Sequence, residues 1–289
     1  MLIRDNFRQQ FYEVIRKNHV LVLVNSDVDA LCAVRILMHL FACDDVAYSL
    51  VVVNGWDSLV RAVDEHAEQS HIAVLINCGA NRALTSLDLA PDMKLYIIDS
   101  RRPLHLDNVY AQDNIYILVN STELAELKCP QASEIFESDS ESSDGEHEEG
   151  EGNRALEDIE KRAIRRTRRQ QWRAKRNDLL WDYYENSWYS ISSAVQMLEL
   201  AHLMGKSSAE TMWCAVVGLN SQLVDRLISF EAYTAVCIDR LRPFIRRYSS
   251  RNGAMKGDDV LRISFDKESL TFIFSLLHHS KSALFDSST

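Results

Sequence analysis

Five short apolar runs, rich in β-branched residues, restrict the fold more than anything else in this sequence. They are Val20–Val24, Tyr48–Val53, Ile72–Ile76, Leu95–Ile98 and Ile115–Val119. Nearly continuous apolar runs of this length are typical of strands covered on both faces, as in a parallel sheet flanked by crossover helices. The sequence therefore predicts an α/β fold built on a parallel sheet.

Helical patterns separate these runs. Between the first two runs, apolar residues recur at helical spacing at Leu31, Val34, Leu37, Met38 and Phe41. The same spacing follows Trp56, at Leu59, Val63 and His66. We expect residues 1–130 to form one α/β domain of the doubly wound type.

The composition changes abruptly at Glu134. Residues 137–152 are dominated by Glu, Ser, Asp and Gly and contain no apolar side chain. Such a segment cannot bury enough surface to offset its chain entropy, so we expect a disordered insert over residues 131–154. The basic segment Lys161–Arg176 follows it and lacks Gly and Pro, which predicts one long helix over residues 155–178.

Residues 179–250 show helical spacing of large apolar residues, with Gly205 and Ser207-Ser208 between segments. We expect a mainly helical subdomain here. Residues 251–289 are predicted to be irregular, although Val260–Phe265 alternates like a strand and Leu270–Leu277 is apolar.

Charge and cysteine usage exclude several classes of function. A formal net charge of -10 argues against a protein whose whole surface binds nucleic acid, so any DNA contact is expected to be local. The six cysteines show no zinc-binding spacing and are expected to be reduced thiols. The polar start and the absence of a long apolar run predict an intracellular, soluble protein.

The residues that follow the predicted strands are the ones that suggest chemistry. Asp27 and Asp29 follow the first strand, Asn77 the third and Asp99 the fourth. Parallel sheets bind ligands at this edge, and carboxylates there suit Mg²⁺ or Mn²⁺. The alternative is structural, with Asp27 capping the following helix and Asp29 in its first turn.

Three strings at these strand ends resemble the DHH phosphoesterase family, which includes the RecJ nucleases. They are Ser26-Asp27-Val28-Asp29-Ala30-Leu31-Cys32-Ala33, Leu75-Ile76-Asn77-Cys78-Gly79-Ala80-Asn81 and Ile97-Ile98-Asp99-Ser100-Arg101-Arg102-Pro103. The resemblance implies a DHH-type α/β domain followed by a mainly helical subdomain.

Compared with active family members, this chain has lost metal ligands. Asp27, Asp29 and Asp99 match, but Asn77 replaces a metal-binding Asp, and Ser100 and Arg101 replace both histidines of the Asp-His-His element. The resemblance thus implies vestigial ligand positions, no metal, no cofactor and no catalytic residue. The alternative, an active metal-dependent phosphoesterase or single-strand exonuclease, requires further ligands.

Two roles remain for the strand-end residues. Asp27, Asp29, Asp99 and Arg101 are expected to form a salt-bridged cluster. Alternatively, Arg101 and Arg102 bind a nucleic-acid phosphate. A third class, a nucleotide-binding α/β protein of the glycine-rich type, is not favoured, since no G-x-G-x-x-G or G-x-x-x-x-G-K-[ST] motif follows a strand.

The resemblance is closest to the eukaryotic replication-fork branch of the family, whose members continue into a second α/β half. It implies a non-catalytic subunit of the replicative DNA helicase, nuclear and chromatin-bound, acting in replication initiation and elongation. The implied partners are the MCM ring, the GINS complex, initiation factors, the replicative polymerase and single-stranded DNA, with no membrane contact.

The two charged segments leave their roles open. Ser138 and Ser143, each followed three residues later by Glu, resemble targets of acid-directed kinases. The predicted basic helix serves single-stranded DNA, partner proteins or nuclear import. Its DNA-binding candidates are Arg165, Arg166, Arg168, Arg169 and Arg173. Trp172 either covers a core or stacks on a base.

Overall fold

The structure is a computed structural model that describes residues 1–4, 6–66, 69–111, 114–136 and 153–249. These residues form two compact units, one of Met1–Ala125 together with the chain from Trp188 onward, the other of Glu126–Ser187. Within the described residues, no helix combines the length and apolarity that crossing a membrane requires.

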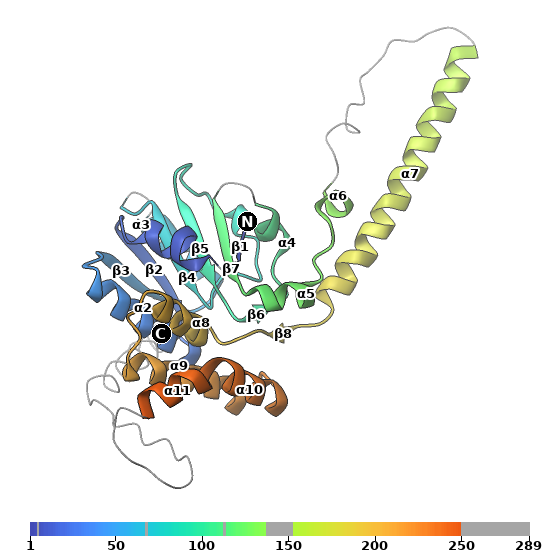
Figure 1. Ribbon diagram of the computed structural model, residues 1–289. Coiled ribbons are helices and arrows are strands. Elements are labelled where there is room, and N and C mark those ends of the chain that lie inside the picture. Colours follow the sequence, from blue (N-terminus) through green and yellow to red (C-terminus); the bar gives the residue numbers. More distant parts are fainter. Residues whose placement is uncertain (5, 67–68, 112–113, 137–152, 250–289) are drawn as a thin grey trace, which may run out of the picture. The chain divides into compact units, whose positions relative to one another are not determined.

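The first unit is built on a six-stranded parallel sheet with the order β1-β7-β5-β4-β2-β3 (Figure 1). The strands are β1 (Leu2–Arg4), β2 (Val20–Asn25), β3 (Tyr48–Val53), β4 (Ile72–Ile76), β5 (Lys94–Ile98) and β7 (Ile115–Val119). All five predicted strands are present, and the α/β fold with a parallel sheet is confirmed. β1 was not predicted, because three residues are too few to show a period.

Helices cover both faces of the sheet. They are η1 (Arg8–Tyr12), α1 (Glu13–Ile15), α2 (Val28–Cys43), α3 (Trp56–His66), η2 (Leu84–Ser86), α4 (Leu106–Tyr110) and η3 (Ser121–Glu123). Alternate residues of β2 separate the two layers. Val20, Val22 and Val24 join a core with α2, whereas the intervening leucines point to the opposite face, where α3 packs.

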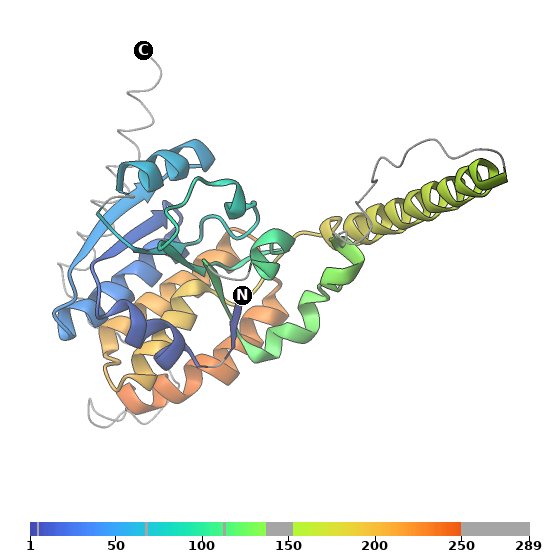
Figure 2. The ribbon, with the colours of Figure 1, turned by 90° about the horizontal axis from the view of Figure 1, so that it is seen from above.

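The segment after Trp188 completes the first unit. It comprises β8 (Trp188–Tyr189), α8 (Ser193–Leu203), α9 (Ala209–Val224), α10 (Phe230–Val236), η5 (Cys237–Leu241) and α11 (Arg242–Ser249). α8 and α9 pack on α2 and on each other, beside the sheet in both views (Figures 1 and 2).

This packing differs from the expected helical subdomain over residues 179–250. α8 and α9 share one core with β2 and α2, because their apolar faces are buried against α2. Residues 179–184 belong to the preceding helix, and Trp188 lies in β8, which pairs antiparallel with β6 (Arg101–Arg102). The helical pattern is therefore interrupted between Glu185 and Ser192.

The second unit holds the basic helix. α7 (Asn153–Tyr184) extends beyond the predicted bounds of 155–178 at both ends, and α6 (Ala132–Ile135) lies inside the expected insert. The two helices are joined by a hydrogen bond from Arg176 Nε to the Ile135 carbonyl (2.7 Å). α5 (Leu124–Leu127) spans the boundary between the units. Most of the acidic run and the predictions over 251–289 lie outside the described residues.

Candidate functional site

The strand-end residues lie where the strand order of the sheet changes direction. The chain places β3 on one side of β2 and β4 on the other, so the carboxyl ends of β2 and β4 flank a topological switch point. Open α/β sheets bind ligands at such a point. The loop after β2 carries Asp27 and Asp29, and the loop after β4 carries Asn77.

Asn77 occupies the centre of this cluster. Its side-chain nitrogen donates to Asp27 Oδ1 (3.0 Å) and Asp29 Oδ2 (3.1 Å). Its side-chain oxygen accepts from Ser193 Oγ (2.6 Å) and from the Ser100 backbone N–H (3.2 Å). An amide can donate two hydrogen bonds and accept two, so Asn77 uses its full capacity. Its backbone is left-handed (φ 50°), a conformation that Asn tolerates.

Asp29 is buried and holds the N-terminus of α8. Its carboxylate accepts from the Ser193 N–H (2.9 Å), the Ala194 N–H (3.0 Å) and the Ser192 hydroxyl, besides Asn77. These donors include otherwise unpaired N–H groups of a helix start, where negative charge is favoured. Burial raises the pKa of Asp29, against the effect of these hydrogen bonds. Asp29 thus connects the sheet edge to a helix 163 residues further along the chain.

Gly218 of α9 completes the enclosure of Asp29. A Cβ at this position would lie 2.6 Å from Ala194 Cβ and 2.9 Å from Asp29 Oδ1. Real Cβ atoms do not approach other atoms so closely. The absence of a side chain at Gly218 therefore lets α9 pack directly against the start of α8 and the Asp29 carboxylate.

Asp27 is half-buried and has two roles. It is the N-cap of α2, accepting from the Ala30 N–H (2.7 Å), as the structural alternative predicted. It also pairs with Arg101, whose Nη2 lies 3.3 Å from Oδ2. The predicted cluster is therefore confirmed for Asp27 and Arg101, whereas Asp29 is held by neutral donors.

Asp99 lies at the end of β5 and is buried. Its carboxylate accepts from the backbone N–H groups of Arg101 (2.9 Å) and Ala80 (3.4 Å). Burial raises the pKa of Asp99, and the nearby guanidinium groups oppose that shift. Burial alone would lower the pKa of Arg101, but the charges of Asp99 and Asp27 outweigh it and raise that pKa.

Arg102 points away from this edge into the protein. Its guanidinium is enclosed and pairs with the buried Glu123 of η3, and it also donates to the carbonyls of Asp99 (2.8 Å) and Arg101 (2.7 Å). An external phosphate cannot reach Arg102 in this conformation. Of the two arginines proposed for phosphate contact, Arg101 alone is partly exposed.

The family model for CDC45 matches residues 20–160 and 120–288 of this chain. The chain belongs to the CDC45 family. Members of the CDC45 family are DNA replication factors.

Individual CDC45 relatives are similar to most of this chain. The chain is 37% identical over 286 residues to the cell division control protein 45 homolog of Homo sapiens, covering 96% of this chain and 49% of the relative. It is 38% identical to the Mus musculus homolog, covering 92% and 48%. The chain thus spans about half the length of these CDC45 relatives.

A solved CDC45 structure has the same fold. CDC45 from Entamoeba histolytica aligns with a TM-score of 0.58 and 20% identity, over 86% of this chain and 39% of that chain. RecJ from Thermus thermophilus in complex with Mn²⁺ aligns with a TM-score of 0.30 and 20% identity, over 41% of this chain and 17% of that chain.

The cluster of this CDC45 chain does not fit the metal pair of an active DHH phosphoesterase. The Asn77 NH₂ group points at both carboxylates, where a cation would have to bind, and Asp29 already accepts four hydrogen bonds. Arg101 adds a positive charge beside Asp27. Within the described residues, no three His, Cys, Asp or Glu side chains are grouped so as to hold a metal ion.

The five arginines predicted to bind DNA lie in the second unit. The side chains of Arg165, Arg166, Arg168, Arg169 and Arg173 are all exposed on α7. Trp172 is half-buried, and the Arg176 guanidinium carbon lies 6.0 Å from its ring centroid. Ser138 and Ser143 lie outside the described residues.

Three residues of the cluster were not anticipated from the sequence: Ser192, Ser193 and Gly218. Two serines before an apolar helical pattern are a recognisable N-cap signal, and Ser192 does cap α8. No sequence pattern indicated that this helix start meets Asp29.

Proposed function

We propose that this CDC45-family chain acts as a non-catalytic part of the replicative DNA helicase, in initiation and elongation of DNA replication. In this role it bridges the MCM ring and the GINS complex and contacts single-stranded DNA in the nucleus. The observation that carries the proposal is the family match over residues 20–288. Because the chain spans about half of its relatives, these activities are proposed for the protein as a whole.

The hydrogen bonding of Asn77 and Asp29 supports the non-catalytic part of the proposal. A two-metal phosphoesterase needs free carboxylate oxygens to bind both cations, and here amide, hydroxyl and backbone donors take that place. The test is incubation of the purified chain with Mn²⁺ and end-labelled single-stranded DNA. We expect no cleavage beyond that of the Asp27→Ala variant. Cleavage that Asp27→Ala abolishes would establish a phosphoesterase instead.

The arginines of α7 support the contact with single-stranded DNA. Arg166, Arg169 and Arg173 are spaced by three and four residues and so share one face of the helix, with Arg165 beside it. Exposed guanidinium groups in such a row can pair with successive phosphates. This arrangement allows a local contact on a chain whose net charge is -10.

The salt dependence of binding tests this assignment. Replacing Arg165, Arg166, Arg168 and Arg169 by Ala should weaken single-stranded DNA binding and flatten the slope of log K against log salt by about 0.7 per lost phosphate contact. Replacing the same four residues by Lys keeps the charge and should retain most of the slope. An unchanged slope in the Ala variant would assign α7 to partner proteins or nuclear import.

The bridging role is tested by co-capture. The tagged chain, mixed with purified MCM ring and GINS complex, should retain both, and omission of the chain should leave them separate. Retention of one complex without the other would contradict bridging.

A further inference from the structure

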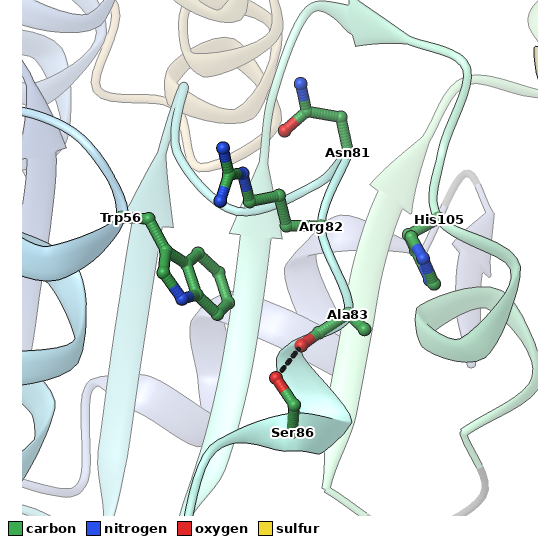
Figure 3. Close-up of a pocket in the computed structure, with 6 residues that line it drawn as sticks. All are labelled: Trp56, Asn81, Arg82, Ala83, Ser86 and His105. Carbon is green, nitrogen blue, oxygen red and sulfur yellow. Dashed lines mark hydrogen bonds between the residues drawn. The ribbon is translucent and has the colours of Figure 1, made fainter.

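A solvent-open pocket of about 390 Å³ lies at the same edge of the sheet. Figure 3 shows its six lining residues, which come from three segments of the chain: Trp56, Asn81, Arg82, Ala83, Ser86 and His105. Trp56 begins α3 after β3, Arg82 follows β4, and His105 is the N-cap of α4. A volume of roughly 300–1,000 Å³ is usual for small-molecule sites. No part of the cluster around Asn77 lines this pocket.

The pocket combines an aromatic face with a cation. The Arg82 guanidinium carbon lies 5.5 Å from the Trp56 ring centroid, and the Arg82 side chain is exposed. None of the six lining residues is acidic, and among the described residues no carboxylate lies within salt-bridge distance of Arg82. In Figure 3 the imidazole of His105 lies on the other side of Arg82 from Trp56.

The loop that carries Arg82 is held from beneath by Asn108. This fully buried side chain donates to the carbonyls of Gly79 (3.2 Å), Ala80 (3.4 Å) and Arg82 (2.6 Å). It also accepts from the Leu84 N–H (2.8 Å). The backbone on both sides of Arg82 is therefore fixed, which sets the point beside Trp56 from which the Arg82 side chain extends.

We propose that this pocket binds a nucleotide, with the base against Trp56 and the phosphate on Arg82. Indole faces stack on any nucleobase, and guanidinium groups match phosphate oxygens with two parallel hydrogen bonds. A glycine-rich loop is not required, because Arg82 supplies the positive charge. The ligand is either a free nucleotide or one residue of a single strand. The second case rests on the proposed contact with single-stranded DNA.

The experiment measures binding of deoxyadenosine monophosphate and of inorganic phosphate to the full chain by calorimetry. Arg82→Gln and Trp56→Leu should each weaken nucleotide binding by about tenfold. Of the two variants, only Arg82→Gln should weaken the binding of inorganic phosphate. Trp56→Phe should retain most of the nucleotide affinity. Arg61→Gln is the matched control, since Arg61 lies on α3 with Trp56 but outside the pocket, its Nε donating to the Asp57 carbonyl (3.3 Å).

Unchanged nucleotide affinity in both Arg82→Gln and Trp56→Leu, with thermal unfolding like that of the wild type, would overturn the proposal. Tighter binding of a phosphoserine peptide than of the nucleotide would overturn it as well. An oligothymidine strand separates the two sources. If the pocket variants lose equal affinity for the strand and for the nucleotide, the pocket is a subsite for single-stranded DNA. If they lose affinity for the mononucleotide only, its ligand is a free nucleotide.

The α7 variant distinguishes failure of the pocket proposal from failure of the proposed function. Replacement of Arg165, Arg166, Arg168 and Arg169 by Ala should leave mononucleotide binding unchanged, because these residues are not part of the pocket. Suppose that the wild type binds the strand in a salt-dependent way, and that both pocket variants bind the nucleotide as tightly as the wild type does. In that case the pocket proposal alone fails.

Discussion

The side-chain nitrogen of Asn77 donates to a carboxylate oxygen of Asp29 at 3.1 Å, and the same nitrogen reaches Asp27 at 3.0 Å. Two carboxylates at a switch point would repel each other without a positive group between them. The amide NH₂ carries partial positive charge and provides two directed donors, so it takes the position that a cation would otherwise need. The amide of Asn77 thereby offsets the repulsion between the two carboxylates.

Asn77→Asp should reverse this balance. A third carboxylate would face two others within hydrogen-bond distance, and the repulsion should destabilise the fold by about 1–4 kcal/mol at neutral pH. Chemical denaturation measures this loss. Asn81→Asp, the same substitution at an exposed position in the same loop, should cost far less.

Added Mn²⁺ sharpens this prediction. Because the oxygens of Asp29 remain bound to the start of α8, Mn²⁺ should not restore the stability of the Asn77→Asp variant. A rise in its melting temperature with Mn²⁺, absent in the wild type, would show that a single substitution recreates a metal site and that the cluster is only one residue away from one.

Asp29→Asn tests the connection between the sheet edge and α8. All four hydrogen-bond partners of Asp29 are donors, and an asparagine NH₂ among them leaves at least one buried donor unpaired, at a cost of roughly 1–3 kcal/mol. Asp57→Asn is the matched control, since Asp57 is exposed in the first turn of α3 and takes no part in the cluster. Equal unfolding free energies for the two variants would argue against this role of Asp29.

Gly218→Ala tests the packing of α9. Helix propensity alone favours Ala over Gly by about 1 kcal/mol in a helix interior. The added Cβ would meet Ala194 and Asp29, so we expect a net destabilisation of about 1–3 kcal/mol. Asn220→Ala, at an exposed position of the same helix, should change the unfolding free energy only slightly. A stabilised Gly218→Ala protein would contradict the close approach.

Much of the fold could be predicted from the sequence, for a physical reason. Strands such as Val20–Val24 are buried on both faces, so nearly every residue is apolar and the run is visible locally. The short strands β1 and β8 carry no such signal, because two or three residues show no period. Their pairing depends on partners that are distant in sequence.

The candidate site was predictable in part. The positions of Asp27 and Asn77 follow from where strands end, and the family resemblance implies that metal ligands have been replaced there. The hydrogen-bond partners of Asp29 could not be predicted from the sequence. They lie at the start of α8, and the packing of α8 on α2 depends on tertiary structure. Arg102 shows the same limit. Adjacent to Arg101 in sequence, it points the opposite way because strand residues alternate between faces.

The ion pair between Arg102 and Glu123 is buried, so breaking it should be costly. Arg102→Met leaves Glu123 charged and without its partner, and the unfolding free energy should fall by about 3–5 kcal/mol. The double variant Arg102→Met with Glu123→Leu removes both charges and should recover part of that loss, as measured by chemical denaturation. If the double variant loses as much as the sum of the two single variants, the two side chains do not act as a pair.

The buried thiols give the fold a dependence on alkaline pH. Burial raises the pKa of Cys214 from 9.0 to about 12, with a further contribution from Glu210. A raised folded-state pKa means that the stabilisation is complete below the unfolded value and is lost as pH rises above it, because the unfolded thiol ionises first. Between pH 8 and pH 10 this loss of stability amounts to about 1.4 kcal/mol for one thiol.

The Cys214→Ala variant should therefore lose about 1.4 kcal/mol less unfolding free energy than the wild type over that interval in urea titrations. Cys43→Ala removes an exposed thiol and should lose as much as the wild type; equal losses in all three proteins would mean that Cys214 ionises as readily in the folded chain as in the unfolded one.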